Sequence, residues 1–349
     1  MGTAEAFQSQ VQDYLSRLDL AEDVVRNSHP VTHVPPLAEY IFRTIARPAF
    51  RRSRLDEQTA GDVKDKVDRA LDDGSPLAFS IPFGGYKTHS SGSFPLPDWA
   101  EVFNLSYIWR FVSPIAEAYA PGVVVEYTYT SGVMELVSNL PPGADDTYMV
   151  AFRAILARFA TRMPPNVRFV ATDLAADPRA SGMMDELQKN YEENRRDWLT
   201  RLSQAERDRR FASAQRNLMP SGSRDLAHLS PSEWDDACVE AAMRCEALDR
   251  LPFRRRYNKQ ESRIELVFVR GPSLAVHVGS CDTSSHHFWS GVGSVENLSG
   301  TRLLTRIMSQ HKLGAARDRG LAMDCAVSGF EMLGEPYELI PVLLPGWGE

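Results

Sequence analysis

The chain has 349 residues, of which 43% are hydrophobic and 24% are charged, and its formal net charge is −7 at pH 7. This ordinary composition excludes disordered, collagen-like and coiled-coil proteins, and the length allows one large domain or two modest ones. The acidic balance argues against a nucleic-acid partner. The lack of a secretory signal and of any apolar run of about 18 residues predicts a cytoplasmic protein that does not span a membrane.

The spacing of apolar residues predicts alternating helices and strands. From the amino terminus we predict helices over 4–27, 36–50 and 57–72, a strand over 76–82, a helix from Asp98 kinked at Pro114, a hairpin over 123–137, a helix over 145–161 and a strand over 167–171. After a candidate linker at 175–182 we predict a charged helix over 183–217, a helix over 230–249, a hairpin of strands 263–269 and 273–279, a loop over 280–300, a basic helix over 301–313 and a strand over 338–344.

This alternation predicts an α/β fold: a mixed sheet with Rossmann-like alternation of helix and strand, plus helical additions at the N-terminus and in the centre. We expect residues 1–175 to form a core domain. Residues 183–349 would form a helical segment and strands that complete or extend it, with a single domain as the alternative.

The loop 83–93 is the leading candidate site, because it follows a predicted buried strand and precedes a predicted helix, where open α/β sheets hold ligands. It carries Tyr86, Lys87 and His89 among glycines and hydroxyl side chains. Lys87 could pair with a phosphate or carboxylate, or form an imine if its pKa is lowered. An ordinary solvated lysine is the alternative. Asp98 and Glu101 could act as an acid/base pair, but their spacing favours a helix cap.

A second candidate group surrounds the predicted strand 273–279. Asp282, His286 and His287, with Cys281 and His277 nearby, could hold a metal ion or supply a general base. Adjacent histidines in an extended chain point to opposite faces, so both rarely bind one ion, and structural or surface roles are the alternative.

Two stretches are rich in arginine. Arg254, Arg255 and Arg256 could clamp a phosphate or carboxylate with guanidinium forks, although a solvated surface run is the simpler interpretation. The arginines of the helix 183–217 are matched by acids, which is typical of a salt-bridged solvent face.

Residues 79–150, about a fifth of the chain, resemble the isonitrile synthases, the pyoverdine/dityrosine-biosynthesis type proteins. In that family a Phe-Pro-x-Lys element is followed by Pro-Asp-x-Ala-Glu and a helix. The matching elements here are Phe79-Ser-Ile-Pro82, Lys87, Leu96-Pro-Asp98-Trp-Ala100-Glu101, Ile115, Tyr119, Pro121-Gly122, Ser131-Gly132 and Tyr148.

The resemblance implies an enzyme of transferase or lyase type. It would convert the amine of an amino acid, typically an aromatic one, to an isonitrile with a carbon from ribulose 5-phosphate, without a metal or redox cofactor. The implied catalytic residues are Lys87, His89, His286 and His287. The implied substrate-binding residues are Tyr86, Ser131, Arg254, Arg255, Arg256 and Trp289, with Tyr129 beside them in an apolar pocket.

Three later elements depart from the family pattern. Ile264-Glu-Leu-Val-Phe268 stands where the family carries Arg-Leu-Ser-x-His, Phe288-Trp289-Ser290 where it carries Pro-Trp-His, and Lys87-Thr-His-Ser90 where it carries Lys-Ser-Pro-Asn. Two other functions are therefore kept open: a metal-dependent small-molecule enzyme using His277, Asp282, His286 and His287, and a non-catalytic ligand- or partner-binding protein that presents the helix 183–217.

Overall fold

The computed structural model describes residues 11–12, 35–51, 53–87, 93–138, 140–209, 211, 230–251, 257, 262–268, 274–279, 288–299, 302–308, 310–320, 323–324 and 338–341. Of the helix predicted over 4–27, only Val11 and Gln12 are described, and both are helical.

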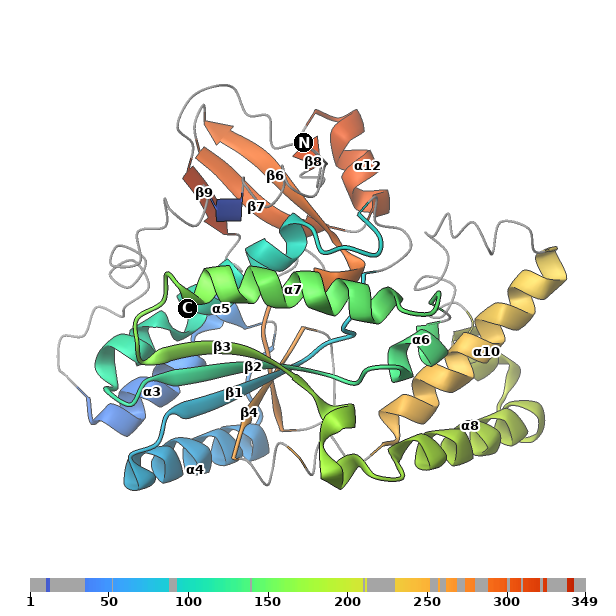
Figure 1. Ribbon diagram of the computed structural model, residues 1–349, viewed down its shortest axis with the longest axis horizontal. Helices are drawn as coiled ribbons and strands as arrows, with labels where there is room; N and C mark the ends of the chain where they lie inside the picture. Colours follow the sequence, from blue (N-terminus) through green and yellow to red (C-terminus); the bar gives the residue numbers. More distant parts are fainter. Residues whose placement is uncertain are drawn as a thin grey trace.

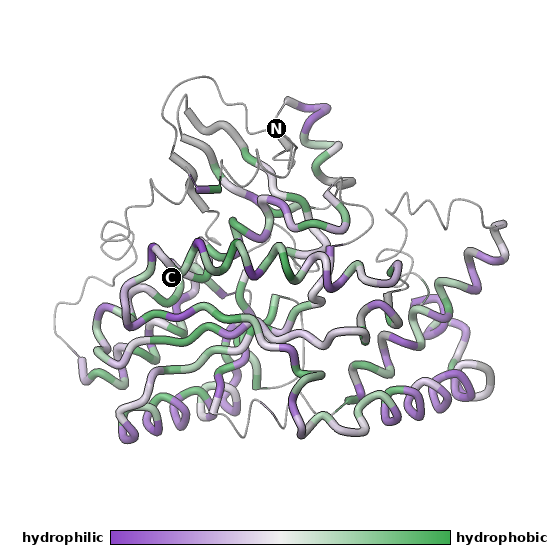
Figure 2. The backbone as a smooth tube through the Cα atoms, viewed as in Figure 1, coloured by the Kyte–Doolittle hydropathy of each residue, from purple (hydrophilic) through white to green (hydrophobic). Residues whose placement is uncertain are grey.

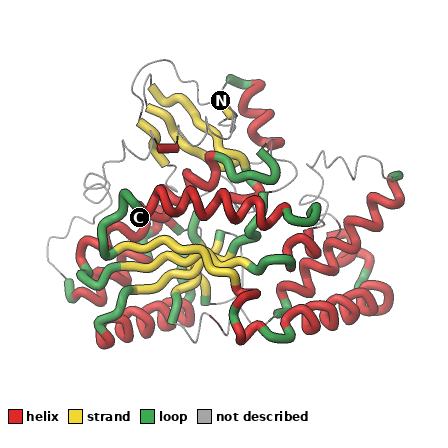
Figure 3. The backbone as a smooth tube through the Cα atoms, in the orientation of Figure 1, coloured by secondary structure: helices red, strands yellow, loops and turns green. Residues whose placement is uncertain are grey.

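A five-stranded parallel sheet forms the centre of the molecule (Figures 1 and 3). Its order is β3-β2-β1-β4-β5, made of β1 (Leu77–Pro82), β2 (Val123–Tyr129), β3 (Val167–Asp173), β4 (Ile264–Val267) and β5 (Ala275–His277). The chain leaves β1 toward β2 on one side, and β4 lies on the other. The order therefore reverses between β1 and β4, the place where doubly wound sheets bind ligands at their carboxyl ends.

Helices α5 (Trp99–Ala118) and α7 (Ala144–Ala160) pack on the same face of this sheet. Phe111 of α5 contacts Phe79 of β1, and Phe159 of α7 contacts Phe169 of β3, with ring centroids 6.0 and 5.2 Å apart. Phe79 and Phe169 belong to one register row, so both helices cover the same side. Helix α5 is buried along most of its length, and its buried residues include the polar Glu101, Asn104, Ser106 and Ser113.

The remaining helices surround this core. The elements that precede β1 in the chain are α3 (Leu37–Ile45), η1 (Pro48–Phe50) and α4 (Glu57–Asp73). At the carboxyl edge of the strands, to the right in Figure 1, lie α6 (Val133–Ser138), η2 (Leu174–Ala176), η3 (Pro178–Ala180), α8 (Met183–Thr200) and α10 (Pro231–Asp249). In Figure 2 the outer side of α8 is hydrophilic, whereas the central strands are largely hydrophobic.

A smaller mixed sheet lies above α5 and α7 in Figure 1. Its strand order is β8-β6-β7-β9, made of β6 (Val292–Ser299), β7 (Arg302–Met308), β8 (Met323–Asp324) and β9 (Glu338–Pro341). In the chain, η4 (Phe288–Ser290) precedes β6, and helix α12 (Gln310–Asp318) lies between β7 and β8. A Cβ at Gly293 would lie 2.6 Å from Cβ of Trp99, so the glycine lets β6 approach the start of α5 closely. The predicted α/β fold is confirmed, with parallel strands throughout the central sheet and mixed pairing in the smaller sheet.

Short sequence patterns predicted the ends of several helices correctly. Asp56 accepts a hydrogen bond from the Thr59 N–H at the start of α4, and Gly74 ends that helix in the left-handed conformation. Ser230 and Glu233 form a capping box at the start of α10, where the helix over 230–249 was predicted to begin. Helix α5 begins after Asp98 as predicted and continues as one helix through Pro114. No helix in the described part of the chain is long and apolar enough to cross a membrane.

Five predictions were wrong. The charged helix predicted over 183–217 is not continuous, because α8 ends at Thr200 and residues 201–203 are not helical. Residues 133–138 form a helix, and β2 pairs in parallel with β1 and β3, so there is no hairpin over 123–137. Strands β4 and β5 are parallel too, which excludes the second hairpin. The predicted loop 280–300 contains η4 and β6, and the predicted basic helix begins with β7. Short apolar segments fit a helix or a strand equally well, and the neighbours that they meet decide between the two.

Candidate active site

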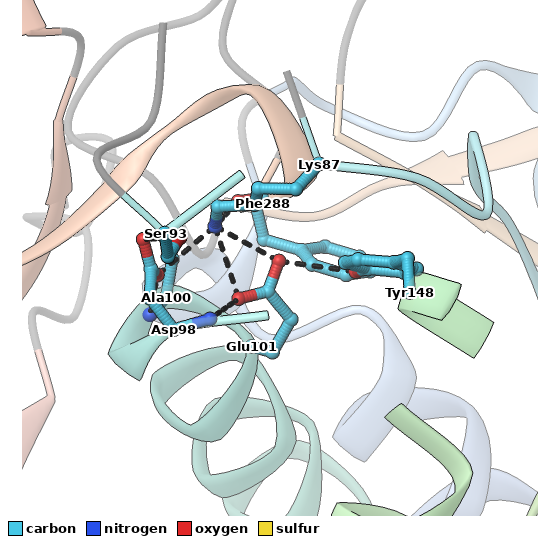
Figure 4. A network of polar contacts seen from close by, with 7 residues as sticks. All are labelled: Lys87, Ser93, Asp98, Ala100, Glu101, Tyr148 and Phe288. Atoms are coloured by element: carbon cyan, nitrogen blue, oxygen red, sulfur yellow. Dashed lines mark hydrogen bonds and ion pairs between the residues drawn. The ribbon is translucent and has the colours of Figure 1, made fainter. Parts of the chain in front are cut away.

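Lys87 follows β1 and is fully enclosed, with none of its side chain exposed. Its Nζ lies 2.9 Å from Asp98 Oδ1, 2.9 Å from Glu101 Oε1 and 3.0 Å from Glu101 Oε2 (Figure 4). The carbonyl oxygen of Phe288 lies 3.4 Å away. The sequence offered a solvated lysine as the alternative, and the structure places this one at the centre of a buried charge cluster.

The capping box of α5 supplies both carboxylates. The Asp98 N–H donates to Glu101 Oε2 at 2.7 Å, and the Ala100 N–H donates to Asp98 Oδ1 at 2.7 Å. The predicted cap is therefore confirmed, but the same two side chains also bind Lys87. A lysine cannot be buried without such compensation, because an unpaired charge in the interior is very costly.

Tyr148 of α7 completes this group, which we name the Lys87 cluster: Lys87, Asp98, Glu101 and Tyr148. The Tyr148 hydroxyl donates to Glu101 Oε1 at 3.0 Å, and its side chain is fully buried. Two carboxyl groups and one ammonium leave the cluster one negative charge in excess when all three are ionised.

Burial and charge shift the pKa values in this cluster. Burial raises the pKa of Glu101, Lys87 lowers it and Asp98 raises it, which brings it to about 7. Burial opposes the charged form of Lys87, but Asp98 and Glu101 outweigh this and raise its pKa. Burial and the adjacent Glu101 raise the pKa of Tyr148 well above its ordinary value. The cluster therefore takes up a proton near neutral pH, and the ammonium of Lys87 is not available to form an imine.

Aromatic rings fill the space beside the Lys87 cluster. Phe83 lies 5.7 Å from Tyr127, 5.2 Å from Phe152 and 5.7 Å from Phe288 between ring centroids. Trp289 stands perpendicular to Phe288 at 4.9 Å. These rings are buried and packed against one another, so they form core around the cluster.

Two glycines shape the turn between β1 and Lys87. Gly85 has φ +71°, and a Cβ there would lie 2.9 Å from the ring of Tyr129. A Cβ at Gly84 would lie 2.3 Å from the Tyr86 ring and 2.8 Å from Trp289 Nε1. Only glycine fits both positions without a shift of these rings, and the turn thereby brings Tyr86, Tyr129 and Trp289 around its backbone.

The carboxyl ends of β2 and β3 add polar side chains to the same edge. Ser131 donates from its N–H and its hydroxyl to Asp173, which ends β3. Arg153 of α7 donates from Nη2 to the Tyr129 hydroxyl at 2.5 Å. Ser131, which was predicted to bind substrate, thus lies at the carboxyl ends of the parallel strands, where such sheets bind ligands.

Of the residues predicted for the site, Tyr86, Lys87, Ser131 and Trp289 lie in the described part of the chain. Those that lie outside it are His89, Arg254, Arg255, Arg256, Asp282, His286 and His287. His277 is half-buried on β5. Within the described residues, no group of three or more His, Cys, Asp or Glu side chains could hold a metal ion.

Arg153 and Asp173 were not predicted from the sequence, and no local pattern linked Lys87 with Glu101 and Tyr148. Asp173 had a usable signal, because it lies two residues after the end of the strand predicted over 167–171. Arg153 had none, since it stands in the middle of a predicted helix.

No protein-family model and no curated protein matches the chain. Among solved structures, the PvcA protein from Pseudomonas aeruginosa is similar, with a TM-score of 0.59 and 15% identity over 80% of this chain and 95% of that one. The tyrosyl-tRNA synthetase from Aeropyrum pernix reaches a TM-score of only 0.30, with 15% identity over 66% of this chain and 53% of that one. The first likeness shows a shared α/β fold, whereas the second is too low to indicate one.

Proposed function

We propose that the chain is an isonitrile-synthase-like biosynthetic enzyme, which condenses the amine of an amino acid with a phosphorylated ketose of the ribulose 5-phosphate type. The fold shared with PvcA supports a biosynthetic role of this kind. The substrates would meet at the carboxyl edge of the five-stranded sheet, where the strand order reverses.

One observation carries the proposal. Four of the residues on which the resemblance to the isonitrile synthases rests, Lys87, Asp98, Glu101 and Tyr148, form one hydrogen-bonded cluster. They come from the loop after β1, the start of α5 and the second turn of α7. A chance resemblance has no reason to select residues that are apart in the chain and meet in space.

The Lys87 cluster acts on the proposed reaction by position and charge. Its ion pairs attach the turn that carries Tyr86 to the start of α5, and this holds the edge of the site in one geometry. Glu101 is enclosed, so we assign it to the charge state of the site and not to contact with substrate. Its pKa of about 7 lets the cluster take up or release a proton near neutral pH.

The remaining roles follow the sequence resemblance. Proton transfers at the amine are assigned to His89, His286 and His287, because imidazoles exchange protons near neutral pH. The phosphate of the ketose is assigned to the guanidinium forks of Arg254–Arg256. Trp289 is buried against Phe288 beside the turn after β1, so we assign it to the shape of that turn and not to direct contact with substrate.

Incubation of the purified chain with each standard amino acid and uniformly ¹³C-labelled ribulose 5-phosphate tests this function. We expect a product one carbon heavier and two hydrogens lighter than the amino acid, with the label in the added carbon, detected by mass spectrometry. Tyr148→Phe should lower the turnover, whereas Arg168→Gln, at an exposed position on β3, should not. If no amino acid yields a labelled isonitrile, the proposed reaction is wrong.

A further inference from the structure

The carboxyl ends of β2 and β3 bring two charged side chains to one tyrosine. Tyr129 and Asp173 are register partners at the last position of the two strands. Arg153 approaches Tyr129 from α7. The proposed reaction so far gives neither charge a role.

Arg153 is an exposed cation held in place by a neutral partner. Its Nη2 donates to the Tyr129 hydroxyl at 2.5 Å, and its guanidinium carbon lies 5.6 Å from the centroid of that ring. No carboxylate among the residues that the structure describes forms an ion pair with it. A guanidinium carries five N–H donors, so most of those of Arg153 remain available to an oxyanion.

Asp173 is the matching anion. It accepts hydrogen bonds from the Ser131 N–H and hydroxyl and from the Ala175 N–H, and it is half-buried. These partners are neutral, and within the described ranges no cation pairs with it. A carboxylate offers about four acceptor positions, so Asp173 keeps room for a further donor.

Both charges lie beside Tyr129, and among the described residues they form no ion pair with each other. The pKa of the Tyr129 hydroxyl is raised by burial and then by Asp173, and Arg153 opposes this, so both charges act on the same group. Here Tyr129 holds the cation and Ser131 holds the anion, which keeps them apart.

We infer that this edge binds the zwitterionic head of an α-amino acid. Arg153 would take the carboxylate and Asp173 the ammonium. The inference deepens the proposed function and rests on it, since an amino acid is one of the two proposed substrates. A phosphate is the poorer ligand, because Asp173, Asp146 and the buried Asp145 all act on the Tyr129 hydroxyl that binds Arg153, and so give this edge an excess of negative charge.

Titration calorimetry on the full chain tests this site. The standard L-amino acids are measured first, and the tightest binder is compared with its carboxamide, which lacks the carboxylate, and with its des-amino acid, which lacks the ammonium. Each is measured on wild type, Arg153→Gln and Asp173→Asn. Arg168→Gln removes the same charge from an exposed position elsewhere on β3 and serves as the control.

We expect each variant to weaken the binding only of ligands that carry the charged group it contacts. Arg153→Gln should weaken the amino acid about tenfold or more, the loss of one charged hydrogen-bonded contact, and leave the carboxamide within about twofold of wild type. Asp173→Asn should weaken the amino acid similarly and leave the des-amino acid unchanged. The asparagine can keep its oxygen toward the Ser131 and Ala175 N–H groups, so the fold of the edge is preserved.

Three results would overturn the inference: no amino acid binds wild type, both variants bind like Arg168→Gln, or Arg153→Gln weakens ribulose 5-phosphate instead of the amino acid. The proposed function fails separately. If the binding pattern holds but no isonitrile forms, the amino-acid site stands and the reaction is wrong. If isonitrile forms while both variants bind normally, the reaction stands and this site is wrong.

Discussion

Replacing Glu101 by glutamine should remove a pH dependence of folding that the Lys87 cluster creates. The unfolded chain releases the Glu101 proton near pH 4.5, whereas the folded protein holds it to about pH 7. Between these values folding takes up a proton, so the contribution of Glu101 to stability is complete below pH 4.5 and is lost as the pH rises through about 7.

The size of the effect follows from the width of that interval. Each pH unit is worth about 1.4 kcal/mol, so a window of about 2.5 units corresponds to about 3 kcal/mol. Glutamine does not titrate. The stability of wild type relative to Glu101→Gln should therefore fall by about 3 kcal/mol between pH 4.5 and 7.

Guanidinium denaturation followed by tryptophan fluorescence measures this difference, since the buried Trp99 adjoins the cluster. Taking wild type minus variant at each pH removes the contribution of titrating groups that do not interact with Glu101. Glu117→Gln, at an exposed position near the end of the same helix, is the matched control and should run parallel with wild type. Parallel curves for wild type and Glu101→Gln would refute the raised pKa of Glu101.

Two further predictions concern the geometry of the site. Tyr148→Phe removes the hydroxyl that donates to Glu101, and it should cost about 1–3 kcal/mol at pH 8, where Glu101 is charged, and less at pH 5. Equal losses at both pH values in the same denaturation assay would contradict this. Gly85→Ala places a Cβ 2.9 Å from the Tyr129 ring at φ +71° and should cost about 1–3 kcal/mol. Gly61→Ala, in α4 with open space around it, should stabilise by about 0.5–1 kcal/mol. A Gly85 variant as stable as the Gly61 variant in thermal melts would show that the turn after β1 adapts.

Local sequence patterns predicted an element correctly where a few neighbouring residues determine its structure. The proline-closed apolar run over 76–82 predicted β1, and the Asp98–Glu101 pattern predicted the start of α5, because a cap acts over a single turn. They failed at 133–138 and 302–308, where a short segment becomes a helix or a strand according to the chain beside it.

The candidate site was only partly predictable for the same reason. Lys87 was found from its loop, and Asp98 and Glu101 from their cap, but each interpretation concerned one segment. Their meeting depends on the path of the loop back onto α5. The hydrogen bond from Tyr148 to Glu101 joins residues 47 positions apart and depends on how α7 crosses the sheet.

By itself, the sequence determined the α/β class, β1, the start of α5 and the residue types available at the edge of the sheet. Only the tertiary structure decided that Lys87 is enclosed, that Glu101 keeps a proton to about pH 7, and that Arg153 and Asp173 lie beside one tyrosine. Propensities and caps act between neighbours along the chain. Burial and charge act between neighbours in space, and the packing of the sheet and its helices sets those distances.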